Sequence, residues 1–357
     1  MKIARIVAPL VVVALSGAAC AQHLMGVKSN APEGVVLLDS ANGTVVNQDW
    51  ISDAFAVGWD FFTPKKALRV GDEIWVSDQV RNAIHRFELD ANDPVNNGPQ
   101  FVGSITGDGV NPFSNIRGMA YDGSRVYLCN FSGFYANQII VIDTATQAVV
   151  NSFQVSSGPF DVEVYGEDLI VVSSGTPHVV RYSKTGANLG VLVQSGLSTP
   201  QGVHVESTDR IWVANSLGND RGLYRYDGAG NLQESILTLG PIGSQAVRGV
   251  WTFDNGDLAA STAGGLFRVV PDGFGGHNFV PLLDGSIFNG QYVTGVDLVG
   301  GPACPPDLNG DGVVDADDFF LFLQLFAAGD MRADFNNDGV IDADDFFAFL
   351  NAFAQGC

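Results

Sequence analysis

An apolar strand that ends in a polar turn recurs along residues 22–300, and this internal repeat constrains the fold more than any other feature of the chain. Short runs of Val, Ile, Tyr, Trp and Phe alternate with Gly, Asn, Asp and Ser turns, a pattern typical of strands. The turn residues are Asp39, Asp90, Asp143, Ser183, Asp227 and Asp272. A second apolar strand precedes five of these turns, at residues 74–76, 126–128, 169–172, 211–213 and 258–260. Four strands in roughly 40–50 residues is the period of a β-propeller blade.

The order of the strands predicts six blades and a closure that uses both ends of the propeller. We expect the innermost strands at residues 67–70, 117–121, 160–165, 201–206, 248–253 and 291–298. The last of these has no outer strands after it, whereas residues 23–28, 34–39 and 44–49 form three strands without an inner one. Together they complete a sixth blade, which removes the exposed edge of an open sheet. A seventh blade would need a hidden repeat, and a two-sheet sandwich, the main alternative, explains neither the period nor the matching ends.

The amino-acid sequence of the blades resembles that of the NHL-repeat and gluconolactonase-like six-bladed propellers. The resemblance rests on Pro-Gln-Gly-Val at 200–203, Arg-Ile-Trp-Val-Ala-Asn at 210–215 and Tyr-Asp-Gly-Ala-Gly at 226–230. It covers roughly residues 22–300, and it implies a fold rather than an activity. That broad group includes calcium-dependent lactonases, lyases and binding propellers. In its lactonases a Glu, an Asn and an Asp hold a channel metal, and the sequence offers only Glu33, Asn130 and Asn215 for comparison, without a complete set of three.

One twelve-residue pattern occurs twice near the C-terminus, at residues 307–318 and 334–345. In both copies, side chains that carry oxygen stand at positions 1, 3, 5, 9 and 12, and Gly stands at position 6. This spacing lets a loop wrap a hard cation with carboxylates, one backbone carbonyl and water, while the Gly permits the central turn. The doubled pattern therefore predicts two bound calcium ions.

The segments that flank these two loops indicate which type of calcium-binding domain they belong to. Each loop runs into an apolar helix, expected at 319–326 and 346–353, while the prolines and glycine of 301–306 prevent a helix before the first loop. Two loop-then-helix units without an entering helix resemble a dockerin domain, the calcium-dependent module that binds cohesins, over about residues 304–357. The resemblance implies the calcium ligands Asp307, Asn309, Asp311, the Val313 carbonyl, Asp315, Asp318, Asp334, Asn336, Asp338, the Val340 carbonyl, Asp342 and Asp345. It also implies a cohesin-like or cell-surface anchoring partner.

The cysteines give a further resemblance and a pairing. Cys304 stands just before the first loop, and the sequence ends in Gly356-Cys357. Dockerins that are bracketed by Cys in this way resemble the C-terminal surface-attachment domains of planctomycete-type bacteria. A Cys304–Cys357 disulfide would close this small domain end to end and would contribute about 4 kcal/mol in the chain-entropy model. Cys129 stands in an apolar strand, and we expect it to be a buried, inert thiol.

The N-terminus predicts export. Lys2 and Arg5 give a positive start, residues 6–15 form an apolar run, and Ala19-Cys20-Ala21 is a small-residue cleavage motif. The run is too short to span a bilayer. We therefore expect a signal peptide over residues 1–21 and no transmembrane segment. Lipidation of Cys20 is the alternative, although Gly17 replaces the bulky aliphatic residue that a lipoprotein motif has three positions before its Cys.

Five propeller residues are candidate ligand contacts: Trp59, Arg117, Asn130, Asn215 and Arg248. Both arginines precede Gly at the same point of an innermost strand, where they could form an anion-binding rim or bond to carbonyls of a neighbouring blade. The two asparagines follow second strands and could face the same rim. Trp59 lies in a long insert, where an aromatic ring could stack on a sugar, plug the channel or cover the core. No Gly-x-Ser-x-Gly elbow or phosphate loop occurs, so no catalytic residue is assigned.

Charge and organisation lead to a prediction of function. A net charge of −21 argues against nucleic acid and anionic membranes as partners. We expect a signal peptide at 1–21, a six-bladed propeller at 22–300 and a dockerin-like domain at 301–357. The expected role is that of a secreted, surface-associated module that binds a protein, glycan or small molecule. The alternative is a secreted enzyme of lactonase, lyase or polysaccharide-degrading type.

Overall fold

The computed structural model describes residues 23–54, 56–176 and 178–298, and near the C-terminus residues 306, 308, 314, 316–328, 333, 335 and 340–355. The chain divides into one unit over Ala21–Ala303 and another that includes Cys304–Cys357. Several expected features lie outside the described residues: residues 1–22, both cysteines of the predicted disulfide, and the loop positions Asp307, Asn309, Asp311, Val313, Asp315, Asp334, Asn336 and Asp338.

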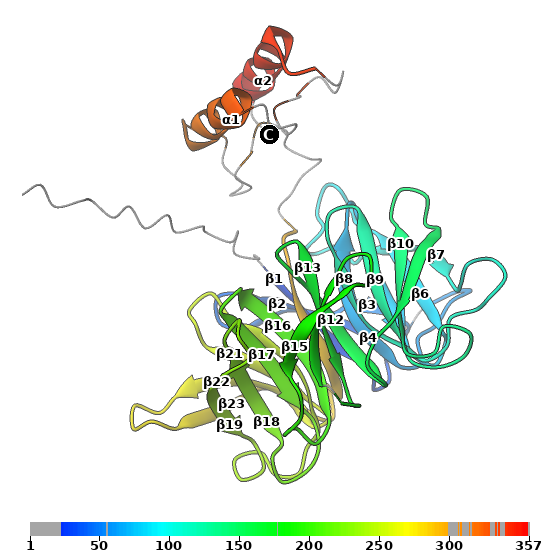
Figure 1. Ribbon diagram of the computed structural model, residues 1–357, viewed down its shortest axis with the longest axis vertical. Coiled ribbons are helices and arrows are strands. Elements are labelled where there is room, and N and C mark those ends of the chain that lie inside the picture. The colour runs from blue at the N-terminus through cyan, green and yellow to red at the C-terminus, as the bar shows by residue number, and fades with distance from the viewer. Residues whose placement is uncertain are drawn as a thin grey trace, which may run out of the picture. The chain divides into compact units, whose positions relative to one another are not determined.

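The described residues of the first unit form six four-stranded antiparallel sheets, which confirms the six-bladed propeller (Figure 1). Blades 1 to 3 consist of β4 (Pro64–Val70), β5 (Glu73–Asp78), β6 (Ala83–Glu88) and β7 (Gln100–Ile105); β8 (Ile116–Tyr121), β9 (Arg125–Asn130), β10 (Gln138–Asp143) and β11 (Val149–Gln154); and β12 (Pro159–Tyr165), β13 (Asp168–Ser173), β14 (Val179–Ser183) and β15 (Asn188–Val193). Blades 4 and 5 consist of β16 (Pro200–Ser207), β17 (Arg210–Asn215), β18 (Gly222–Tyr226) and β19 (Leu232–Leu237); and β20 (Val247–Thr252), β21 (Leu258–Thr262), β22 (Gly265–Pro271) and β23 (His277–Asp284).

Blade 6 closes the ring with strands from both ends of the unit, as the sequence predicts. It is ordered β24 (Gly290–Val296), β1 (His23–Lys28), β2 (Gly34–Asp39) and β3 (Val45–Ser52). β1 pairs antiparallel with β24 on one side and with β2 on the other. The first strand of each blade contacts the first strand of the next, in the cycle β4, β8, β12, β16, β20, β24 and back to β4. These six innermost strands therefore surround the central channel.

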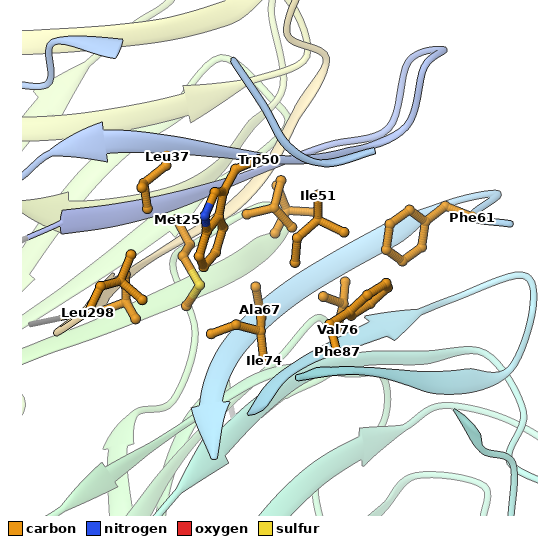
Figure 2. Close-up of a cluster of buried hydrophobic side chains, with 13 residues drawn as sticks. Met25, Leu37, Trp50, Ile51, Phe61, Ala67, Ile74, Val76, Phe87 and Leu298 are labelled. Atoms are coloured by element: carbon orange, nitrogen blue, oxygen red, sulfur yellow. The ribbon is translucent and has the colours of Figure 1, made fainter. Parts of the chain in front are cut away.

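Each blade is buried on both faces, which explains why its middle strands read as continuous apolar runs. In β5, Ile74 and Val76 belong to the core shared with blade 6, whereas Trp75, between them, belongs to the core shared with blade 2. Figure 2 shows the first of these cores, where Met25 and Trp50 of blade 6 meet the side chains of blade 1. A similar hydrophobic core lies between every neighbouring pair of blades.

The second unit contains two helices among its described residues, α1 (Ala316–Ala328) and α2 (Ala343–Gln355). Each begins within the last positions of a predicted calcium loop, slightly earlier than the sequence predicts. Phe322 of α1 and Phe349 of α2 stack with their ring centroids 4.1 Å apart and an interplanar angle of 6°, and both are buried. The apolar residues that follow each loop thus form the core of this unit. Across the described residues, no helix is long and apolar enough to cross a membrane.

Candidate functional site

All six innermost strands carry the same irregularity near their first residue. In blade 3, Pro159 pairs with Ser173 and Asp161 pairs with Val172, so Phe160 is one extra residue on the innermost strand. The other five blades have one extra residue at the same place. Such bulges re-aim a side chain away from the regular ladder. The residues at this position are Lys65, Arg117, Phe160, Gln201, Arg248 and Gln291, which we call the mouth ring.

The mouth ring lies at the end of the channel where the innermost strands begin. Contacts join its members between neighbouring blades, since the Lys65 Nζ donates to the Gln291 Oε1 at 2.9 Å and the Arg117 guanidinium lies over the Phe160 ring at 3.8 Å. Arg248 and Phe160 are partly exposed, as are Lys65 and Gln201, so this end of the channel meets solvent. Three of the six ring residues are cationic and none is acidic.

Glycine follows the ring position where the neighbouring backbone comes close. A Cβ at Gly202 would lie 2.5 Å from the carbonyl oxygen of Arg248, and one at Gly118 would lie 2.7 Å from the Cα of Asp161. Real Cβ atoms do not tolerate such distances, so only glycine fits. The Arg-Gly and Gln-Gly pairs of the sequence therefore reflect the tight approach of blades around the channel.

Arg117 is the most enclosed cation of the mouth ring. It is 7% exposed, and its guanidinium lies between the rings of Phe131, at 4.2 Å, and Phe160. Its Nε donates to Oδ1 of Asn115 at 3.2 Å. Within the described part of the chain its buried Nη1 has no hydrogen-bond partner. An unpaired buried donor is costly, so the Arg117 Nη1 needs an acceptor that the described residues do not supply.

Arg248 and Lys65 add two further cations near Arg117. The Arg248 Nη1 donates to Oδ1 of Asn289 at 2.7 Å and to the carbonyl of Gly290 at 3.0 Å, which is the neighbouring-blade bond considered from the sequence. Burial lowers the pKa of Lys65 to about 7, together with the positive charges of Arg248 and Arg117, while Asp78 opposes this. Among described residues, none of the three cations forms a salt bridge.

Side chains that cross the channel form a floor beneath the mouth ring. The Tyr292 hydroxyl, from blade 6, lies 2.9 Å from the carbonyl oxygen of Phe160 and 3.2 Å from that of Gln201. Lys66 of blade 1 reaches across to blade 3, where its Nζ lies 2.8 Å from Oδ1 of Asp161 and 2.6 Å from Oε1 of Glu163. Burial opposes the charge of Lys66, but the two carboxylates outweigh it and hold the Lys66 pKa above its ordinary value.

Asn130 and Asn215 occupy equivalent places at the ends of the second strands β9 and β17. The Asn130 Oδ1 accepts from the backbone N–H of Ser114 at 2.8 Å, and its Nδ2 donates to the carbonyls of Ser132 and Tyr135. Asn215 accepts from the N–H of Thr199 at 2.9 Å and donates to Asp220. Both buried amides are thus engaged in holding the loops that lead into the innermost strands.

Trp59 lies apart from the mouth ring, against the outer strands of blade 1. Its ring stacks on Phe101 of β7, with centroids 5.4 Å apart, and meets Phe61 and Phe87 edge-on. It covers the core between blades 6 and 1 rather than the channel. Glu33, the other residue compared with lactonases, lies between β1 and β2, and its carbonyl accepts from the N–H of Asp53.

The sequence points to Arg117 and Arg248 but not to their partners. The predicted first innermost strand begins at Ala67, which leaves Lys65 and Lys66 in a connecting loop, where paired lysines look like an ordinary solvated segment. Tyr292 looks like one more apolar strand residue. The six residues of the mouth ring could be found by aligning the innermost strands, because each is the second residue of its strand.

Comparisons with known proteins agree with the fold. A chain in the crystal structure of a nidogen/laminin complex matches 76% of this chain over 97% of its own length, with a TM-score of 0.56 and 12% identity. A protein of unknown function from Bacteroides caccae matches 76% of this chain over 98% of its own, with a TM-score of 0.53 and 14% identity. No protein-family model and no curated protein matches the sequence. At these identities the likeness shows a shared fold alone.

Cys129 is a buried free thiol in β9, and the sequence predicts this burial. Burial raises the pKa of Cys129 well above its ordinary value, helped by the charge of Asp161. A thiol with so little thiolate is a poor nucleophile. It therefore packs as a small apolar side chain in the core between blades 2 and 3.

Proposed function

We propose that this chain is a secreted propeller that binds a ligand at its mouth ring and is attached to the cell surface through its calcium-dependent C-terminal unit. The observation that carries the proposal is the ring itself. A bulge in every blade turns one side chain to the same end of the channel, and three of these side chains are cations without a counter-charge in the described residues. Partly buried cations without a counter-charge do not stabilise the fold, and this favours a role for them in ligand recognition.

The polar groups near the mouth ring support ligand binding rather than turnover, because they are engaged in hydrogen bonds within the protein. The amides of Asn130 and Asn215, which would hold a metal in a lactonase-like site, are engaged in hydrogen bonds to their own loops. Tyr292 and the Lys66 ion pairs fill the channel below the mouth ring. A ligand would therefore rest on a preformed floor, where rigid hydrogen-bond donors favour recognition.

The C-terminal unit supports the proposed attachment. Asp318 and Asp345, at position 12 of the two loops, are fully buried at the start of α1 and α2, and Oδ2 of Asp345 accepts from the N–H of Asp342 at 2.8 Å. Carboxylate oxygens are hard ligands of the kind that calcium takes. Phe320 and Phe347, which occupy equivalent positions in the two repeats, are 58% and 64% exposed. Exposed aromatic rings of this kind suit contact with an anchoring partner.

Export and the disulfide belong to the same proposal. The signal peptide over residues 1–21 would bring the chain to an oxidising exterior, where a Cys304–Cys357 bridge is stable. Peptide mapping under non-reducing conditions checks the pairing. A bridge that involves Cys129 would contradict both the pairing and the domain boundary.

Screening the full-length protein against glycans and metabolites, with binding and turnover measured on the same samples, tests the proposed function. We expect at least one saturable ligand and no turnover. An Asn215→Ala variant separates the two classes of function. If the wild type turns over a lactone or glycan and the variant does not, the chain is an enzyme and the binding proposal is overturned.

Calcium is expected to fold the C-terminal unit. Chelation should remove most of the helical circular dichroism of α1 and α2, because the loop carboxylates repel one another without metal. Asp307→Ala combined with Asp334→Ala, at position 1 of each loop, should reproduce this loss in the presence of calcium. Asp344→Ala, which removes an exposed acid at a non-ligand position, is the matched control and should bind both ions. A helical signal that chelator leaves unchanged would contradict the calcium site.

A further inference from the structure

We infer that the mouth ring recognises an oxyanion group of its ligand, a carboxylate, sulfate or phosphate, which Arg117, Lys65 and Arg248 bind together. This inference rests on the proposed binding function and names the chemistry of the ligand. The three side chains come from blades 2, 1 and 5, and each stands at the bulge of its innermost strand, at the same end of the channel.

The donors at the mouth ring match an oxyanion. Arg117 is held in one orientation by two aromatic rings, and its Nη1 is a buried donor without a partner in the described structure. The Lys65 Nζ has one acceptor, Gln291, and can donate further hydrogen bonds. Of the Arg248 nitrogens, only Nη1 donates hydrogen bonds to atoms of the described residues. Arg248 and Arg117 are close enough to Lys65 to lower its pKa. Preorganised N–H donors that lie near one another are how proteins bind carboxylate, sulfate and phosphate groups.

A negatively charged side chain of the protein does not take this place. Asp78 is the acid that acts on Lys65 electrostatically, but its carboxylate already accepts from the backbone N–H groups of Phe62, Thr63, Val80 and Arg81. Asp161 and Glu163 are part of the floor, where both carboxylates pair with Lys66. No acidic side chain among the described residues therefore pairs with Lys65, Arg117 or Arg248. A bound anion would offset the mutual repulsion of these three cations.

The inference makes anion binding depend on pH in a defined direction. The groups that face Lys65 are Arg248 and Arg117, which lower its pKa to about 7 together with burial, and Asp78, which opposes them. A bound anion would raise this pKa again, so binding takes up a proton above neutral pH. Affinity should therefore fall by up to about 10-fold from about pH 6 to about pH 8, and the measured binding enthalpy should vary with the ionisation enthalpy of the buffer.

Calorimetric titration of the full-length protein with sodium sulfate, sodium phosphate, sodium glucuronate and uncharged glucose, at constant ionic strength set with chloride, tests the inference. We expect saturable binding of at least one oxyanion probe and none of glucose, and the three anions distinguish sulfate, phosphate and carboxylate sources. Arg117→Gln and Arg248→Gln should each weaken binding at least about 10-fold. Lys65→Gln, which keeps a hydrogen-bonding side chain beside Gln291, should weaken binding and remove its pH dependence.

Arg210→Gln is the matched control, because Arg210 is a surface arginine that pairs with Glu206 outside the mouth ring. It should bind the probes as the wild type does. The inference is overturned if no oxyanion binds at millimolar concentration, or if Lys65→Gln and Arg248→Gln bind as tightly as the wild type. Either result leaves the binding proposal itself standing, since the ligand screen would still detect a neutral ligand. A screen without any ligand would overturn the binding proposal instead.

Discussion

A chain that lacks residues 23–52 is expected to lose the cooperative unfolding transition of the propeller. The deletion removes β1, β2 and β3 and leaves β24 as the whole of blade 6. It also removes Met25, Val35 and Leu37 from the core with blade 1, and Leu24 from the core with blade 5. The lost burial exceeds the net stability of a typical domain, about 5–15 kcal/mol. Thermal unfolding followed by circular dichroism measures the effect.

A rearranged chain provides the matched control for this deletion. His23 pairs directly with Val296, so the end of β24 and the start of β1 lie side by side. Residues 23–52 attached behind residue 298 by a short turn should restore blade 6 and the transition. Removing residues 301–357 should leave the propeller transition in place. A deleted chain that melts like the full-length protein would contradict the closure of the ring.

Lys66→Met is expected to lower the free energy of unfolding of the propeller by about 3–5 kcal/mol, because it leaves Asp161 as an unpaired buried carboxylate. Lys66 is 1% exposed, and its Nζ also lies 3.3 Å from the carbonyl oxygen of Val162. For a domain of this size the melting temperature should fall by roughly 10 °C. Combining the change with Asp161→Asn should recover much of the loss, since no unpaired charge then remains.

The pH dependence of the Lys66→Met variant gives a second signature. Burial raises the pKa of Asp161, and Lys66 opposes that shift. Without Lys66 the folded-state pKa lies further above the unfolded value, so protonation favours folding, and this contribution is lost as pH rises through the folded pKa. The deficit of the variant should therefore shrink on acidification from about pH 8 to about pH 5.

Lys28→Met is the control for that comparison. Lys28 is also a buried lysine, but its partner Asp49, at 2.9 Å, is half-exposed and keeps its hydration when the lysine is removed. The loss of this ion pair should cost less than about 1 kcal/mol. Equal destabilisation by Lys28→Met and Lys66→Met would contradict the special role of the ion pairs across the channel.

The blades could be predicted from the sequence because each depends on local patterns. Turns such as the one after Asp143 occur six times, and apolar runs such as Ile74–Trp75–Val76 precede five of them. The strands left over at the two ends of the propeller complete one further blade when they pair with each other. The bounds of the innermost strands are harder to predict, since Pro64 and Pro159 begin strands from which proline is usually excluded. Both stand at the first position of an innermost strand, which tolerates a missing N–H.

The mouth ring could not be predicted in the same way. Its members come from six strands separated by dozens of residues, and each is turned inward by a bulge, which depends on pairing and leaves no periodicity in the sequence. Lys66 and Tyr292 act across the channel, so their partners Asp161 and Phe160 lie far away in the sequence. Arg117, Gln201 and Arg248 share a following Gly, and this shared neighbour is the one trace of their equivalence in the sequence.

Anomalous diffraction from crystals of the full-length protein grown with sodium selenate tests the central claim most directly, because selenium marks an oxyanion without ambiguity. The account predicts a selenium peak at the mouth ring, with selenate oxygens within hydrogen-bonding distance of Arg117 Nη1 and Lys65 Nζ. The peak should be absent from crystals of Arg117→Gln grown in the same solution. Selenate that binds only elsewhere on the propeller, or that remains at the ring in Arg117→Gln with unchanged occupancy, would contradict the account.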